Sequence, residues 1–370
     1  MSEENIKEIT ERKKTLHIRY DWFDQFRGLI IIFLIISVIT WPLSGEFGSF
    51  INPIGPPLLN HGFQYYDGYP ALITIIDIGQ QIFMFVLGFG AYIAFSNRRE
   101  KRGVKIAWKH GLIRVAILYA LAFLDDGLIG GIAFGDGEIP WNEVLYYGTL
   151  ANLAIGTFAA YLATYLIPKN ADRRILLSIG ILFVHAVLLF LPFFRHHGSS
   201  TGWPPDPWNF PWNTLNHAAI AIAGTCFSQW YKMDPNDPKV GFKKRILPVA
   251  TITIILFYCF DWIQPAEHHD ATTSLSLLAI AAAGFLIAIF YGFEKLKFKV
   301  PILSEMGKNM LLLFIIAFIF DVYVGLLAEN MRDFLVAYPI ITMLLIGVLP
   351  IVIEAGIALL LARKNIIIKI

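Results

Sequence analysis

The chain has 370 residues, of which 56% are hydrophobic and 16% charged, with a formal net charge of +2 and a mean hydropathy of +0.59. Soluble domains carry about a quarter charged residues, so this composition excludes a soluble globular enzyme. Nucleic-acid binding is not supported either, because the membrane topology described below accounts for the basic residues.

In chain order, ten apolar segments are long enough to cross about 30 Å of hydrocarbon. They cover residues 28–44, 71–96, 108–124, 146–168, 174–193, 213–232, 245–263, 271–293, 309–328 and 336–362. Backbone groups must be hydrogen-bonded inside lipid, so we expect helices, and the alternation typical of a membrane barrel is absent. The predicted fold is an all-α polytopic integral membrane protein with an N-terminal segment at 1–27, a single ten-helix domain at 28–362 and a tail at 363–370. The N-terminal segment lacks the features of a signal peptide, so we expect the first span to remain as an anchor.

The basic residues fall in alternate connections between these segments. Of the 30 Lys and Arg residues, only Arg195 and Arg332 lie in the other connections. Because Lys and Arg are retained in cytoplasmic loops, both termini are expected to be cytoplasmic, in a multi-pass protein of the cell membrane.

The connections on the opposite face are acidic and contain several histidines. Two of them, residues 45–70 and 195–212, are long and rich in Gly, Pro and Trp. Long ordered loops usually act as lids or binding loops. We therefore expect a binding site on the outer face.

Asp24 and Arg27 stand three residues apart just before the first span, so they can pair on one helix face. The simpler interpretation is a surface ion pair with an interfacial anchor. The functional alternative is a guanidinium fixed at the membrane edge, where it can hold a phosphate group.

His61 is the only histidine in the outer loop before the second span. A histidine titrates near neutrality, so it can exchange protons or carry an acyl group, although a lone loop histidine is more often simply exposed. Asp77 lies within the second span, where a carboxylate is costly and usually faces a cavity or a partner. Gln80 and Gln81 follow within one turn, so an interhelical hydrogen-bond network is an equally good interpretation.

Other polar residues lie within or at the ends of the predicted spans. They are Asp125, Asp126, Asn152, His185, Asn216, His217, Asp261, Asn309, Asp321 and Glu354. Asn216, His217 and Asp261 are placed to line one outer cavity, and His185 is expected to hydrogen-bond to a neighbouring helix. Glu354 is expected to snorkel toward the inner surface.

Several chemical signatures are missing from the sequence. It contains no Gly-rich phosphate loop, no Gly-x-Ser-x-Gly turn and no His-Glu-x-x-His motif. Cys226 and Cys259 are expected to be free thiols in the core, and no metal is expected.

Four stretches resemble the transmembrane acyltransferases typified by heparan-α-glucosaminide N-acetyltransferase and its prokaryotic relatives. They are Asp24-Gln-Phe-Arg27-Gly28, His61 followed by the stretch from Asp77 to Gly88 and the Arg98-Arg99 loop, Trp141-Asn-Glu-Val144 leading to Gly148-Thr-Leu150, and Gly307-Lys308-Asn309. Their order and spacing extend over about residues 19 to 330, which is most of the chain.

The resemblance implies transfer of an acetyl or other acyl group from cytoplasmic acyl-CoA to a sugar amine or hydroxyl outside. It implies that His61 is the catalytic residue and that Asp77 is its partner. The CoA phosphates would lie near Arg27, Arg98, Arg99 and Arg114, to which we add Asn309 from the fourth stretch. We expect the acceptor to contact Asp125, Asp126, His217 and Asp261.

The chain also departs from the family pattern. An Asn late in the first matched helix is missing, and a Leu-Gln-Arg-Leu stretch is replaced by Leu150-Ala-Asn-Leu153. Two alternatives therefore stay open. The protein could be a catalytically inactive relative, or a polytopic transporter in which charged residues within the spans relay a small solute or ion. The expected partners are the lipid bilayer and an extracytoplasmic glycan, and a homodimer stays open.

Overall fold

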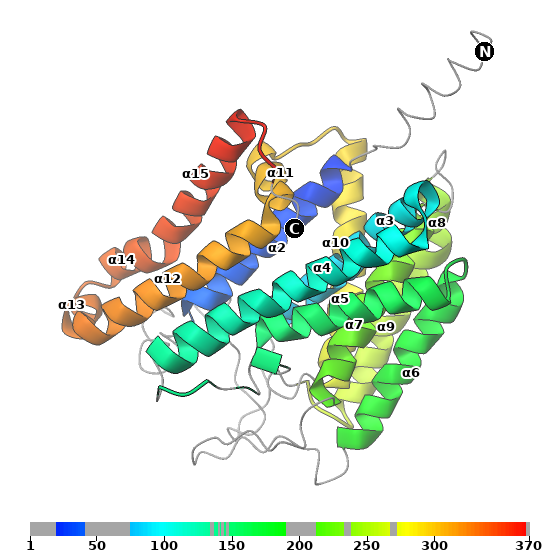
Figure 1. The fold of residues 1–370 in the computed structure, drawn as a ribbon, viewed down its shortest axis with the longest axis horizontal. Helices are drawn as coiled ribbons and strands as arrows, with labels where there is room; N and C mark the ends of the chain where they lie inside the picture. Colours follow the sequence, from blue (N-terminus) through cyan, green and yellow to red (C-terminus); the bar gives the residue numbers. More distant parts are fainter. Residues whose placement is uncertain are drawn as a thin grey trace.

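The computed structural model describes residues 20–40, 75–133, 137–139, 141, 144–145, 148–189, 212–232, 238–266 and 272–367, and these residues form helices without strands (Figure 1). The long helices are α2 (Asp21–Thr40), α3 (Ile75–Arg102), α4 (Val104–Ala122), α5 (Thr149–Leu166), α6 (Ala171–Leu189), α7 (Trp212–Tyr231), α9 (Leu247–Asp261), α10 (Thr273–Lys295), α12 (Met310–Asn330) and α15 (Leu349–Arg363). Short helices are α8 (Pro238–Gly241), α11 (Pro301–Lys308), α13 (Arg332–Ala337) and α14 (Pro339–Thr342). Wider π-helical stretches are η3 (Phe123–Ala133), η7 (Phe242–Ile246) and η8 (Met343–Val348).

Each of the ten predicted segments overlaps a helix. The largest error is at the first, where α2 begins at Asp21 rather than near residue 28. Trp22 and Phe26 are completely buried, and the indole of Trp22 donates a 2.9 Å hydrogen bond to the hydroxyl of Tyr231. The charged start of α2 is therefore part of the packed bundle.

Length and apolarity alone identify fewer membrane spans than the sequence prediction. Four helical stretches qualify: Asp77–Arg102, Thr149–Leu166, Thr273–Lys295 and Leu344–Arg363. The bent pair Pro301–Lys308 and Met310–Val324 makes a fifth if it counts as one span. The outer surfaces of α6, α9 and α15 expose large apolar side chains, such as Phe183, Ile255 and Val352, as expected for a surface in contact with lipid.

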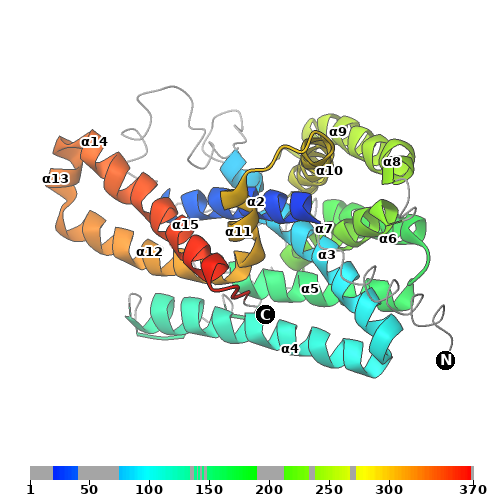
Figure 2. The same cartoon turned by 90° about the horizontal axis from the view of Figure 1, so that it is seen from above.

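The bundle has α2 and α3 between two groups of helices. Figures 1 and 2 show α12 to α15 on one side of α2, with α6, α7, α9 and α10 on the other, while α4 runs along an edge. Close backbone contact joins α3 to α7: a Cβ on Gly88 would lie 2.0 Å from the carbonyl oxygen of Ala221, and one on Gly224 would lie 2.2 Å from that of Phe85. Glycine at both crossing points lets the two helices pack at this distance.

The turn between α3 and α4 lies at one end of the bundle. Gly103 has φ +85°, in the left-handed region that favours glycine, so α3 ends sharply and α4 turns back. Lys101 and Arg102 precede this turn, and the side chain of Lys232 at the end of α7 donates a 3.2 Å hydrogen bond to Asn97 of α3. We call this end, marked by residues 98–102, the basic end.

Candidate active site

The first and fourth family-like stretches meet where α2 crosses α11. A Cβ on Gly28 would lie 1.9 Å from the carbonyl oxygen of Leu303, and one on Gly307 would lie 1.8 Å from that of Asp24. Any side chain at either position would displace the backbone of the other helix. We call this contact the glycine crossing, and it joins residues that are about 280 positions apart in the chain.

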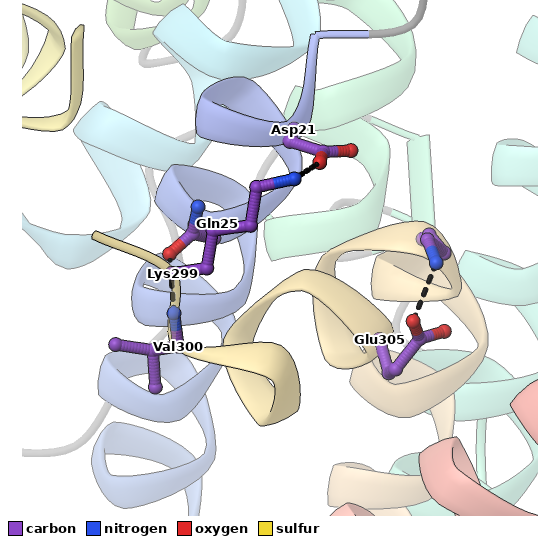
Figure 3. A network of polar contacts seen from close by, with 6 residues as sticks. Asp21, Gln25, Lys299, Val300 and Glu305 are labelled. Carbon is purple, nitrogen blue, oxygen red and sulfur yellow. Dashed lines mark hydrogen bonds and ion pairs between the residues drawn. The ribbon is translucent and has the colours of Figure 1, made fainter. Parts of the chain in front are cut away.

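Polar contacts surround the glycine crossing (Figure 3). Lys299 pairs with Asp21, and the backbone N–H of Val300 donates a 2.8 Å hydrogen bond to the buried side chain of Gln25. On α11, Lys308 pairs with Glu305. The contacts of Lys299 and Val300 fix the segment that leads into α11 against the first turns of α2.

Arg27 and Asn309, both expected to contact the acyl donor, lie beside this crossing. Arg27 is half-buried and pairs with buried Asp24 at 3.4 Å, which confirms the predicted ion pair. Asn309 is buried at the break between α11 and α12, where the helix axis bends by 87°. The residue predicted to start the ninth span therefore lies at a sharp bend between two helices.

The other expected donor contacts lie on α3 and α4. Arg98 and Arg99 are half-buried at the basic end of α3, and Arg114 is half-buried on α4, eleven residues beyond the Gly103 turn. The structure therefore groups Arg27 with Asn309 and Arg98 with Arg99, while Arg114 occupies a separate helix.

Asp77 lies at the opposite end of α3 from Arg98 and Arg99. Its side chain is completely buried, and it shares one helix face with Gln81 and Gly88, the face that meets α7. With a rise of 1.5 Å per residue, α3 separates Asp77 from Arg99 by about 33 Å, which is about the thickness of the hydrocarbon core. His61 lies outside the described residues, so its proximity to Asp77 stays a prediction.

Polar side chains from α5, α6 and α7 are buried in the same part of the bundle as Gln81. A Cβ on Gly156 of α5 would lie 2.3 Å from the sulfur of Met84 on α3 and 3.3 Å from the carbonyl oxygen of His217 on α7. His185 of α6 lies about two turns beyond Ser178, whose hydroxyl donates a hydrogen bond to the carbonyl of Ala219 on α7. We call this group of buried side chains the outer polar cluster, and it consists of Asp77, Gln81, Asn152, Thr157, His185, Asn216 and His217.

A comparison with protein families matches residues 20–355 to a family described as an acyltransferase domain. The chain belongs to this family. No curated protein matches its sequence. The family supports an acyltransferase embedded in a membrane, and the acyltransferase domain covers both the glycine crossing and the outer polar cluster.

The expected acceptor contacts of this acyltransferase domain fall in three places. His217 belongs to the outer polar cluster, whereas Asp125 and Asp126 are half-buried in η3. Burial raises the pKa of Asp126 from 3.8 to about 6. Asp261 ends α9 and accepts a 2.7 Å hydrogen bond from the backbone N–H of Ala266, so its carboxylate stabilises the following turn.

Three other sequence expectations have clear outcomes in the acyltransferase domain. The Nδ1 atom of His185 shares a 3.3 Å hydrogen bond with the hydroxyl of Thr273 on α10, which confirms the predicted contact of His185 with a neighbouring helix. The expectation that Glu354 snorkels is wrong, because Glu354 is completely buried on the one buried stripe of α15, with Pro350 and Ala358. Cys226 is buried as expected, but Cys259 is exposed on α9.

The sequence pattern does not single out Arg174, which reads only as one of the basic residues of a cytoplasmic connection. Its guanidinium is completely buried and donates hydrogen bonds to the carbonyl of Ile167 at 2.7 Å and the side chain of Gln229 at 2.6 Å. It also lies 5.0 Å from the ring centre of Tyr92. Thr157 is not singled out either, because a threonine in an apolar helix carries no signal of its own.

Proposed function

We propose that this acyltransferase domain moves an acetyl or other acyl group from cytoplasmic acyl-CoA to an amine or hydroxyl of a sugar on the outer face of the cell membrane. The proposal includes ten membrane spans with both termini in the cytoplasm. The observation that carries it is the course of α3, which has basic side chains at one end and the buried carboxylate of Asp77 at the other. One rigid helix thus links a region suited to phosphate groups with a region suited to proton transfer.

In this proposal the donor's phosphates bind near Arg27, Arg98 and Arg99, with Arg114 and Asn309 as further contacts. The pantetheine arm passes between helices toward the outer polar cluster. This route would bring the thioester near Asp77, and the proposal requires His61 to lie beside it.

The transfer itself requires a base and a leaving group. The imidazole of His61 takes the proton from the acceptor's amine or hydroxyl as that nucleophile attacks the thioester carbonyl. The C–S bond then breaks, and the imidazolium returns its proton to the CoA thiolate. In the covalent variant, an imidazole nitrogen of His61 attacks the thioester carbonyl, the C–S bond breaks, and the CoA thiolate takes the N–H proton of the ring. The acceptor's nucleophile then takes the acyl group from the imidazole and returns its own proton to the ring. In both cases Asp77 orients the imidazole and stabilises its charged form.

The test is acyl transfer by membranes that contain the protein, using labelled acetyl-CoA. We expect His61→Ala to abolish transfer and Asp77→Asn to reduce it by at least tenfold. His110→Ala is the matched control, because His110 is an exposed histidine on α4. Equal transfer by wild type and His61→Ala would reject His61 as the catalyst.

The second candidate function is transport of a small solute or ion. The buried carboxyl group of Glu354 and the bend at Asn309 favour it, because buried acids and broken helices occur at transport sites. Thermal stabilisation of the purified protein by CoA separates the two candidates. An acyl-CoA-dependent transferase gains stability from CoA by mass action, and a transporter of another solute does not.

A further inference from the structure

Four buried side chains in the outer polar cluster have unused hydrogen-bonding atoms. Among the described residues, no partner contacts either amide atom of Gln81 or Asn216, the hydroxyl of Thr157 or the Nε2 atom of His185. Gln81 is 1% exposed, Thr157 1%, and both His185 and Asn216 0%. Buried polar groups in native proteins are nearly always paired, so unpaired ones that occur together require an explanation.

These four side chains come from four helices that meet. Gln81 lies on the face of α3 that contacts α7, and Met84, three residues later, touches the backbone of Gly156 on α5. Thr157 is the next residue after Gly156, and Asn216 directly precedes His217, whose carbonyl oxygen also faces Gly156. His185 lies about two turns along α6 from Ser178, whose hydroxyl contacts the carbonyl of Ala219 on α7. Helix α7, which carries Asn216, therefore contacts each of the three helices that carry the other unused groups.

Three buried hydroxyl groups elsewhere in the same helices are paired, whereas the hydroxyl of Ser228 on α7 has no partner within the described part of the chain. Ser178 of α6 donates a 2.7 Å hydrogen bond to the carbonyl of Ala219, Thr225 of α7 donates one of 2.6 Å to Ile222, and Thr164 of α5 donates one of 2.8 Å to Ala160. Among the described residues, unpaired atoms also occur at the other ends of two of these helices, at Ser228 near the end of α7 and at the Nε atom of Arg174 near the start of α6. The four side chains named above differ in that they belong to one cluster on contacting helices, which is typical of a site that a ligand completes.

We propose that Gln81, Thr157, His185 and Asn216 form the subsite that holds the acceptor, and that this acceptor is a neutral or amine-bearing polyhydroxy compound. The inference rests on the proposed function, which supplies the transfer reaction. Amide, hydroxyl and imidazole groups each donate and accept hydrogen bonds, as sugar hydroxyls do. The nearby carboxyl group of Asp77 favours an amine and disfavours a carboxylate, phosphate or sulfate at this position.

The experiment separates ligand binding from structural roles. Gln81→Leu and Asn216→Leu replace unsatisfied amides by apolar groups, so we expect them to leave the thermal midpoint of the purified protein unchanged or raised. The matched controls Ser178→Ala and Thr225→Val remove paired hydroxyls and should lower it. Thermal shifts are then measured with glucosamine, glucose, glucuronic acid and CoA as separate probes.

In wild type we expect stabilisation by glucosamine or glucose and none by glucuronic acid. Gln81→Leu and Asn216→Leu should weaken sugar binding by at least tenfold and leave the CoA shift unchanged, while both controls keep the sugar shift. If a leucine variant does not fold, the isosteric Thr157→Val variant replaces it in the same comparison.

Three results would overturn the inference: no stabilisation of wild type by either glucosamine or glucose, equal stabilisation by glucuronic acid, or a sugar shift that survives the substitutions. Failure of the proposed function looks different. In that case the sugars act as expected on wild type and its variants, but CoA gives no shift and no acyl group is transferred.

Discussion

The glycine crossing and the outer polar cluster differ in whether their buried polar groups have hydrogen-bond partners. At the crossing, Asp24 pairs with Arg27, Gln25 accepts a backbone N–H, and the helices touch backbone to backbone. In the cluster, Gln81, Thr157 and Asn216 are buried just as deeply but contribute hydrogen-bonding atoms with no partner among the described residues.

This difference in pairing distinguishes polar groups that stabilise the fold from polar groups that are available to a ligand. A typical hydrogen bond adds about 1 kcal/mol to stability, whereas an unsatisfied buried group costs about 1–3 kcal/mol. Paired groups at the crossing therefore stabilise the fold, and unpaired groups in the cluster lower its stability. Proteins retain such a cost mainly at sites that bind or react. Four predictions test how far this contrast extends.

The largest expected effect is at the glycine crossing. Gly28→Ala would place a methyl group 1.9 Å from the carbonyl oxygen of Leu303, and a backbone neighbour cannot move aside cheaply. We expect a loss of about 3 kcal/mol, seen as a lower thermal midpoint or loss of monodisperse protein in detergent. Gly90→Ala is the matched control, because no heavy atom lies within 4 Å of a Cβ there, and it should gain up to about 1 kcal/mol from helix propensity. A stable Gly28→Ala protein would contradict the close contact.

Arg174 provides the next test, since it is a buried charge that is largely satisfied. Arg174→Met leaves the carbonyl of Ile167 and the side chain of Gln229 without their donor, so we expect a loss of about 2 kcal/mol. Arg173→Ala, at the exposed neighbouring position, should change the midpoint by less than about 0.5 kcal/mol. Equal midpoints for the two variants would show that the buried guanidinium does not stabilise the α5–α6–α7 contact.

A smaller effect is expected from Asp126, which depends on pH. Burial raises its pKa from 3.8 to about 6, so between these values the folded protein binds this proton more tightly than the unfolded chain does. Its contribution to stability is therefore most favourable below about pH 4 and is lost as pH rises through about 6. A shift of about two units corresponds to about 3 kcal/mol, which partial exposure reduces to about 1 kcal/mol. The measurement is the thermal midpoint of wild type and of Asp126→Asn as a function of pH. If the two profiles run parallel, the raised pKa of Asp126 is refuted.

The smallest effect is expected from the exposed ion pair beside the crossing. Lys299 and Asp21 are both more than 40% exposed, at 60% and 43%, and the pair raises the pKa of Lys299. Exposed pairs contribute little because water and salt screen them. We expect Lys299→Met to leave the midpoint unchanged at physiological salt. A clear loss would mean that this pair, and not only the glycine contact, holds α11 in place.

The sequence predicts the helices well because each long apolar segment overlaps a helix in the structure. It places the start of α2 too late, since Asp24 and Arg27 read as a surface boundary although their pairing lets that turn pack inside the bundle. The sequence prediction does not identify α11 as a helix separate from α12. Glu305 and Lys308 are charged, so residues 301–308 read as part of a polar connection and not as a short helix.

For the candidate site, sequence reasoning finds Asp77 and His217, because ionisable residues inside apolar segments are rare. It does not find the unsatisfied set of Gln81, Thr157 and Asn216 as a group. Whether an amide or hydroxyl is paired depends on which helices become neighbours, and no local pattern encodes that. The error at Glu354 has the same cause, since only the packing of α15 against α2, α11 and α12 buries it.

The glycine crossing also has a consequence for how the chain is assembled in the membrane. Helix α2 is synthesised well before α11, yet the notch at Gly28 is filled by residues 301–308, which leave the ribosome only after most of the other described helices. During synthesis α2 therefore lacks the neighbour that fills this notch, and the glycine crossing can close only in a late step. Chains truncated before α11 should keep an open groove along α2, which quality-control proteases can recognise.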